Sequence, residues 1–237
     1  MKRSWTYILA LLMMVLTLGL SSCLKDGQDD LEELVAAVEA LNAIPDSKGI
    51  ILALDNNQLN NLQMGEYFLS GQLLNYRRVY PGNRLLRVFH PESVDDNNAV
   101  FRKELFFEAG KYYSLFVVET PQKEVEVIQV TDEVTAPGEG KALIRFINLN
   151  PGASALDLGI VGQSSLLATN IGFKTHTVFM AIDADKEYKF EIKHSGSAAG
   201  SSAGGSAGSY TFNWTPKNRD IYTLWTNGGQ THGVIIH

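Results

Sequence analysis

Cysteine is nearly absent from the sequence, because Cys23 is the one cysteine among 237 residues. A single thiol excludes an internal disulfide, and it excludes the multi-cysteine zinc sites that stabilise many small domains. The rest of the chain must therefore be held together by hydrophobic cores. The sequence also lacks the run of about 20 apolar residues that a membrane-spanning helix requires.

Basic residues are in the minority. After Ser22, 18 of them (20 in the chain less Lys2 and Arg3) stand against 26 acidic residues, a formal charge of −8. An excess of negative charge repels phosphate backbones, and no run of lysine and arginine offsets it. Nucleic acid is therefore not expected as a partner.

The N-terminus has the order of a secretory signal peptide. Lys2 and Arg3 precede an apolar run, Ile8–Leu20, that is interrupted only by Thr17 and Gly19. The run ends in Leu20-Ser21-Ser22-Cys23, which resembles the lipobox of bacterial lipoproteins. The alternatives are an ordinary signal peptide with a chance cysteine and a core helix. Since a lone cysteine in an exported chain needs a reason, we expect removal of residues 1–22 and lipidation of Cys23.

A polar tether, residues 23–34, follows the expected cleavage site. Its sequence Leu24-Lys25-Asp26-Gly27-Gln28-Asp29-Asp30 resembles the lysine-plus-acidic signal that directs some lipoproteins to the exterior of the outer membrane. Acyl chains at Cys23 would hold the protein in that membrane. We expect a lipid-anchored outer-membrane protein that faces the cell exterior, and the alternative is the periplasmic face.

The chain contains an internal repeat at an offset of 106 residues. Ala36–Asn56 overlays Ala142–Gly162 without a gap, and with small length changes Leu85–His90 overlays Tyr188–Lys193 and Tyr112–Phe116 overlays Ile221–Trp225. Such self-similarity indicates tandem structural units. The predicted boundaries are 35–132 and 141–237, joined by a linker at 133–140 that is rich in turn formers.

Within each unit the apolar residues alternate with polar ones, as in Tyr188–Ile192 and Glu124–Ile128. This alternation, with β-branched and aromatic residues between Pro-Gly and Asn-Gly turns, predicts an all-β fold of two β-sandwiches. Residues Leu31 to Asn42 are ambiguous, because their apolar spacing is helical. Ala36–Leu41 overlays the clear strand Ala142–Ile147, so we predict a strand there, with room for a helical turn before it.

The sequence from Ala142 to Leu158 resembles the opening of the domain of unknown function 4397 family, with its Ile-Arg-Phe-Ile-Asn strand, Asn-Pro turn and Ala-Leu-Asp strand. Glu108–Phe116 and Val79–Asn83 are similar to the closing strand and the Pro-Gly turn of that family. The first copy departs from the pattern at Val38-Glu39-Ala40, and the second at Pro216–Arg219. The resemblance implies tandem immunoglobulin-like sandwiches on an exported lipoprotein, and it implies no activity, cofactor or catalytic residue.

No enzyme motif is recognisable, so we expect no catalytic residue, no cofactor and no metal. The five histidines, which lack metal-site spacing, are His90, His176, His194, His232 and His237. Asp95–Asn98 lacks the spaced ligands of a calcium loop, and a polar hairpin tip is the favoured interpretation. Residues Ser195–Ser209 read as a flexible linker, either a tolerated insertion or a loop that contacts a partner.

Three aromatic residues near the C-terminus, Trp214, Tyr222 and Trp225, could form a platform for sugar rings if they were exposed. Alternation divides them between two faces of a strand, so core packing is the competing interpretation. We therefore expect a non-catalytic surface module that binds a protein or a glycan. The alternatives are a glycan-binding accessory lipoprotein of a nutrient uptake system and a hydrolase, which would need a convergent catalytic cluster.

Overall fold

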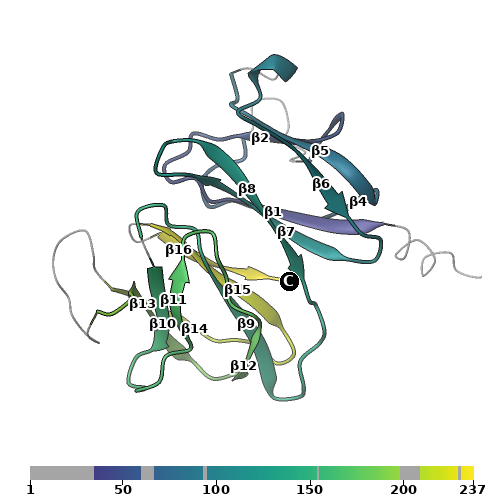
Figure 1. Cartoon of the computed structure of the whole chain (residues 1–237). Helices are drawn as coiled ribbons and strands as arrows, with labels where there is room; N and C mark the ends of the chain where they lie inside the picture. The colour runs from purple at the N-terminus through teal and green to yellow at the C-terminus, as the bar shows by residue number, and fades with distance from the viewer. Residues whose placement is uncertain (1–34, 60–66, 93–94, 154, 198–208, 229–230) are drawn as a thin grey trace, which may run out of the picture.

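The computed structural model describes residues 35–59, 67–92, 95–153, 155–197, 209–228 and 231–237 (Figure 1). These residues form β-strands and one short 3-10 helix, η1 (Asp96–Asn98). The first sandwich consists of β1 (Ala36–Asn42), β2 (Ile51–Leu54), β3 (Asn57–Gln58), β4 (Leu73–Val79), β5 (Gly82–Phe89), β6 (Phe101–Phe107), β7 (Tyr112–Glu119) and β8 (Val125–Asp132). The second consists of β9 (Lys141–Asn148), β10 (Ala155–Ile160), β11 (Ala168–Gly172), β12 (Met180–Asp183), β13 (Tyr188–His194), β14 (Tyr210–Trp214), β15 (Ile221–Gly228) and β16 (Thr231–Ile236).

Each sandwich is built from two four-stranded sheets with the same strand order. The first has β4-β1-β7-β8 and β3-β2-β5-β6, and the second has β12-β9-β15-β16 and β11-β10-β13-β14. In both, the first strand of the unit pairs in parallel with a late one, β1 with β7 and β9 with β15. The predicted all-β fold of two sandwiches is confirmed, and the topology is consistent with the immunoglobulin-like prediction.

The ambiguous segment at the start of the first sandwich is a strand from Ala36 to Asn42, as the repeat predicts. It lies between β4 and β7, and nearly every residue of it is buried. Because both faces of this central strand are covered, its apolar residues do not alternate, which explains the misleading helical spacing. Residues 31–34 lie outside the described residues.

Each sandwich has its own core between its two sheets. Leu52, Leu86 and Val88 are buried in the first core, and Leu158, Phe190 and Ile192 in the second. The ladders pair Leu52 with Val88 and Leu158 with Ile192, so Val88 is the equivalent of Ile192. The overlay of Leu85–His90 on Tyr188–Lys193 found the right strands but was wrong by one residue, because Leu85 and Leu86 are both apolar although Leu86 alone belongs to the core.

A third apolar cluster joins the two sandwiches. It combines residues from the outer faces of sheets β4-β1-β7-β8 and β12-β9-β15-β16, namely Leu41, Ala43, Phe116, Val118 and Val130 with Ile147, Leu149, Trp225 and Ile235. Asn227 donates a hydrogen bond from Nδ2 across this contact to the carbonyl oxygen of Ala43, at 3.0 Å. The two units therefore pack face to face.

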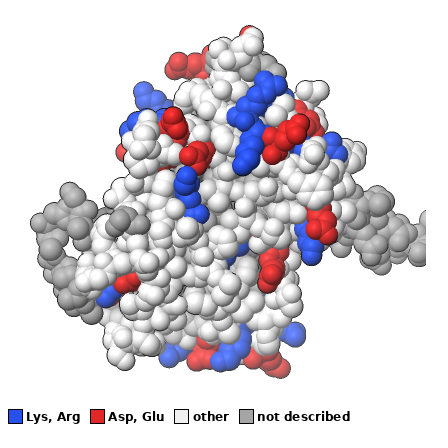
Figure 2. All heavy atoms as spheres, viewed as in Figure 1, with Lys and Arg blue, Asp and Glu red and all other residues white. Residues whose placement is uncertain are grey.

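The expected signal peptide, Cys23 and the tether lie outside the described residues, as does most of the Ser/Gly-rich segment. Among the residues that the structure describes, no helix is long and apolar enough to cross a membrane. Figure 2 shows basic and acidic side chains close to one another on the face viewed, without a broad patch of either sign.

Candidate functional site

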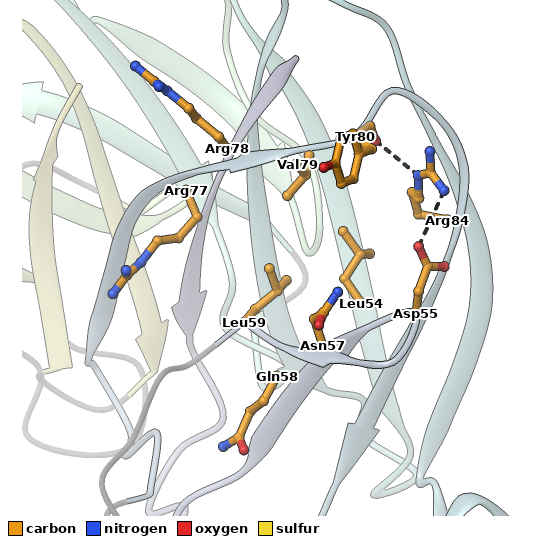
Figure 3. Close-up of a pocket in the computed structure, with 10 residues that line it drawn as sticks. All are labelled: Leu54, Asp55, Asn57, Gln58, Leu59, Arg77, Arg78, Val79, Tyr80 and Arg84. Carbon is orange, nitrogen blue, oxygen red and sulfur yellow. Dashed lines mark hydrogen bonds and ion pairs between the residues drawn. The ribbon is translucent and has the colours of Figure 1, made fainter. Parts of the chain in front are cut away.

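A cleft of about 330 Å³ opens at one side of the first sandwich, where strand β3 of one sheet lies near strand β4 of the other (Figure 3). Its apolar lining consists of Leu54, Leu59 and Val79, which are all buried. These positions face the core, so the cleft exposes the margin of the hydrophobic interior between two sheet edges. Ligand sites commonly combine such apolar surface with a few polar groups.

Tyr80 forms a wall of this cleft. It follows β4, and because it is 76% exposed its ring is presented to solvent. The guanidinium carbon of Arg84 lies 5.9 Å from the centre of the ring, within reach of a cation–π contact. Arg84 also donates from Nε to the carbonyl oxygen of Tyr80 at 3.0 Å and from Nη2 to that of Pro81 at 2.6 Å. These contacts hold the turn that carries the ring.

Asp55 completes the support of this turn. Its Oδ1 accepts a hydrogen bond from the backbone N–H of Leu85 at 2.9 Å, and its Oδ2 lies 3.5 Å from Nη1 of Arg84. Both carboxylate oxygens are thus engaged within the protein. Asp55 and Arg84 therefore position the site, and other groups are left to meet a ligand.

The side chains with free polar groups at the cleft are Asn57, Gln58 and Arg77. All three are exposed, and no hydrogen bond or ion pair joins them to another residue of the described ranges. Arg78 also borders the cleft, but its side chain points away from the other labelled residues in Figure 3. Two amides, one guanidinium and an exposed ring over an apolar floor can bind a molecule that has both an apolar face and hydroxyl groups.

The three aromatic residues named from the sequence lie elsewhere. Tyr222 is buried, and its hydroxyl accepts from the Lys217 N–H at 2.8 Å and donates to Asp220 at 2.9 Å. Trp225 is buried between the sandwiches, and Trp214 packs partly buried against the second core. Burial leaves Tyr222 and Trp225 without a free ring face. Tyr80 was missed, although its place before a Pro-Gly turn suggests exposure.

A second polar cluster lies buried between the sandwiches. Glu39, Asp132 and His237 each offer one potential metal-ligand atom, and these atoms lie within 4.8 Å of one another. The same atoms are already engaged by protein groups: the Ser114 hydroxyl lies 2.7 Å from Glu39 Oε1 and 2.8 Å from Asp132 Oδ2. The Tyr76 hydroxyl lies 2.9 Å from Asp132 Oδ2 and 3.0 Å from His237 Nδ1.

Arg145 supplies the positive charge of this cluster. Its Nη2 donates to Asp132 Oδ1 at 2.7 Å and its Nε to Thr223 Oγ1 at 3.1 Å, while the guanidinium lies 4.7 Å from the Phe179 ring centre. Arg145 already neutralises Asp132, and the hydroxyls of Ser114 and Tyr76 lie between the potential ligand atoms. These contacts are those of an ion-pair network between two domains, and they match a metal centre poorly.

A known protein family matches the sequence of the first sandwich and the start of the second. The family described as Domain of unknown function (DUF4397) matches residues 36–159, which is 124 of the 237 residues. The chain belongs to this family. The matched DUF4397 region holds the whole first sandwich, including the cleft at Tyr80, together with β9 and nearly all of β10.

Other comparisons give no function. No curated protein matches the sequence. Among solved structures, a CBM26 module from Eubacterium rectale Amy13K in complex with maltoheptaose is 10% identical, with a TM-score of 0.28 over 86% of this chain and 97% of that one. A streptococcal virulence factor described for alpha-glucan binding is also 10% identical, with a TM-score of 0.25 over 83% of this chain and 95% of that one. Likeness at these scores carries no argument about the ligand of this DUF4397 protein.

Proposed function

We propose that this protein is a non-catalytic, lipid-anchored binding module of the bacterial cell envelope, and that it binds an oligosaccharide in the cleft at Tyr80. The observation that carries the proposal is the Tyr80 ring, which is 76% exposed and braced by Arg84 at the mouth of an apolar cleft. Single exposed aromatic residues are common, but this ring is also held at a cleft by hydrogen bonds to its turn. A ring that is exposed and oriented in this way is suited to stacking on a ligand.

The groups that line the cleft suit a sugar. A sugar ring has a face of C–H groups that can stack on Tyr80 and on the apolar floor, and a rim of hydroxyls that both donate and accept hydrogen bonds. Asn57 and Gln58 offer amides with the same dual capacity, while Arg77 offers donors only. Since Arg77 is cationic, a sugar with an acidic substituent would gain an additional contact with it.

The N-terminal sequence supports an envelope location. An acylated Cys23 would tether the sandwiches to the outer membrane, facing the exterior in our proposal, with the periplasmic face as the alternative. A surface module of this kind fits a glycan-binding accessory role in nutrient uptake. A protein partner at the cell surface is the second candidate, because a loop of such a partner could enter the same cleft and pack on Tyr80.

The test is a glycan array probed with the purified chain from residue 24 onward. We expect binding to a subset of glycans, loss of that binding in Tyr80→Ala, and its retention in Tyr80→Trp. Val178→Ala is the matched control, because Val178 is 80% exposed in the other sandwich. Binding that survives Tyr80→Ala would move the site elsewhere, and a wild-type chain that binds no glycan would overturn the proposal.

A further inference from the structure

The two sheet faces that meet between the sandwiches use equivalent positions of the two units. The parallel pairing of β1 with β7 places Glu39 opposite Ser114, and that of β9 with β15 places Arg145 opposite Thr223. Glu39 and Arg145 are therefore the same position of the repeat. The sequence offset of 106 residues gives the same equivalence.

A second pair of equivalent positions lies on the neighbouring strands. Asp132 pairs with Tyr112 at the start of β7, and the backbone N–H of His237 donates to the carbonyl oxygen of Ile221 at the start of β15. Since Tyr112 and Ile221 overlay in the repeat, Asp132 and His237 are equivalent. In this pair too, the first sandwich carries the acid and the second carries the base.

Each acidic side chain of the first sandwich contacts the basic side chain that occupies the other position in the second sandwich. Arg145 lies 2.7 Å from Asp132, and His237 Nδ1 lies 3.2 Å from Glu39 Oε1. None of these four side chains is more than 2% exposed. The contact thus resembles a dimer with approximate twofold symmetry, in which the acids of one half meet the bases of the other.

The apolar part of the contact does not distinguish the two faces. The positions that hold Leu41 and Phe116 in the first sandwich hold Ile147 and Trp225 in the second, and all four are buried in the shared cluster. Apolar residues alone would let two first sandwiches from different copies of the chain pair as readily as a first with a second. The faces differ in the buried ionisable groups, and in the amide of Asn227, which takes the position of Val118.

We propose that these charges make the face a docking surface that accepts only the opposite sandwich. Pairing of two first sandwiches would bury four carboxylates against one another, and pairing of two second sandwiches would bury two arginines and two histidines. Carboxylates facing carboxylates, or guanidiniums facing guanidiniums, without partners in a dry contact are strongly disfavoured, so the arrangement selects against association through the wrong face. The surface thereby couples a first sandwich to a second one and excludes contacts between like sandwiches of separate copies.

The test uses the chain from residue 24 onward with a site for a sequence-specific protease inserted after Thr135, which is exposed in the linker. After cleavage, we expect native mass spectrometry to show mixed pairs of first and second sandwiches and no pairs of like sandwiches. Arg145→Asp should separate the two pieces, and Asp132→Arg should do the same. The combined Asp132→Arg and Arg145→Asp exchange should restore the mixed pair, with at least a 10-fold gain in association over either single variant.

Two controls keep the test decisive. Lys174→Asp reverses a charge at the rim, where Lys174 pairs with Glu126 at 2.7 Å and both are over one-third exposed, and it should leave the pieces together. Glu39→Gln, Asp132→Asn, Arg145→Met and His237→Phe together should retain the pairing but allow like pairs. Circular dichroism of the separated pieces distinguishes loss of docking from unfolding.

Two results would overturn the proposal. One is that sandwiches of the same kind pair in the cleaved wild-type chain. The other is that the first and second sandwiches stay together in an Arg145→Asp variant that is still folded.

Discussion

The indole ring of Trp225 lies directly against Gly233, its neighbour across the β15–β16 ladder. A Cβ at Gly233 would stand 2.7 Å from the ring atoms Cε2, Cζ2 and Nε1. That distance is far below a normal contact, so the glycine provides the room in which Trp225 reaches the contact between the sandwiches.

Substitution Gly233→Ala should therefore destabilise the protein. Overpacking of this kind costs about 1–3 kcal/mol, and we expect the urea midpoint to fall accordingly. Gly138→Ala is the matched control, because no atom lies within 4 Å of a Cβ at that position. An equal midpoint for Gly233→Ala and the control would show that the ring can move aside without loss.

Whether a strand is buried on one face or on both decides how well its surroundings could be predicted from the sequence. The alternating strand Tyr188–His194 was recognised easily, because its inward residues form the second core. On β7, Leu115 and Val117 point into the first core, while Phe116 and Val118 lie in the cluster between the sandwiches. A continuous apolar strand reveals that both faces are covered, but the partner on the second face cannot be read from it.

The candidate site was beyond sequence reasoning for a different reason. Tyr80 follows one edge strand, and Asn57 lies on another edge strand that belongs to the opposite sheet. Their proximity depends on how the two sheets stack, a relationship that local patterns do not contain. His237 looked like an ordinary histidine for the same reason, because its buried partner Glu39 lies at the opposite end of the described chain.

Tyr76 gives the protein a pH-dependent stability at high pH. Burial raises the pKa of its hydroxyl above the ordinary value of about 10, and the neighbouring charges of Asp132 and Glu39 raise it further. The folded state thus keeps the proton while the unfolded chain loses it. The associated stability is complete below about pH 10 and falls by up to about 1.4 kcal/mol per pH unit above that point.

The variant Tyr76→Phe has no proton to lose there. We expect its free energy of unfolding, measured in urea between about pH 9 and pH 11, to decline less steeply with pH than that of the wild-type protein. Tyr210 and Tyr222, whose pKa values are also raised by burial, are present in both proteins and cancel in the difference. Identical slopes for the two proteins would contradict the prediction.

Cys23 provides a test of the proposed anchor. Cys23→Ala removes the thiol that would be acylated, so the protein should move from the membrane fraction to the soluble fraction of fractionated cells. A Cys23→Ala protein that stays with the membrane would argue against lipid anchoring.

The side of the membrane is tested separately, with protease added to intact cells. The protease should digest the wild-type protein if it faces the exterior. Survival of the protein would place it on the periplasmic side.

Arg84 is predicted to act on a ligand through Tyr80. Its side chain supports the ring and the Tyr80-Pro81 turn, yet its hydrogen bonds go to the protein and leave little to offer a ligand. Arg84→Gln should free the ring to take several orientations, and ordering it again would weaken glycan affinity roughly 3- to 10-fold.

The stability of Arg84→Gln should change little, by about 1 kcal/mol or less, because the ion pair with Asp55 is partly exposed. Arg78→Gln is the matched control, since Arg78 borders the same cleft but points away from it in Figure 3. Isothermal titration with a glycan that the array identifies measures both variants. Unchanged affinity in Arg84→Gln, alongside loss of binding in Tyr80→Ala, would mean that the ring binds without being braced.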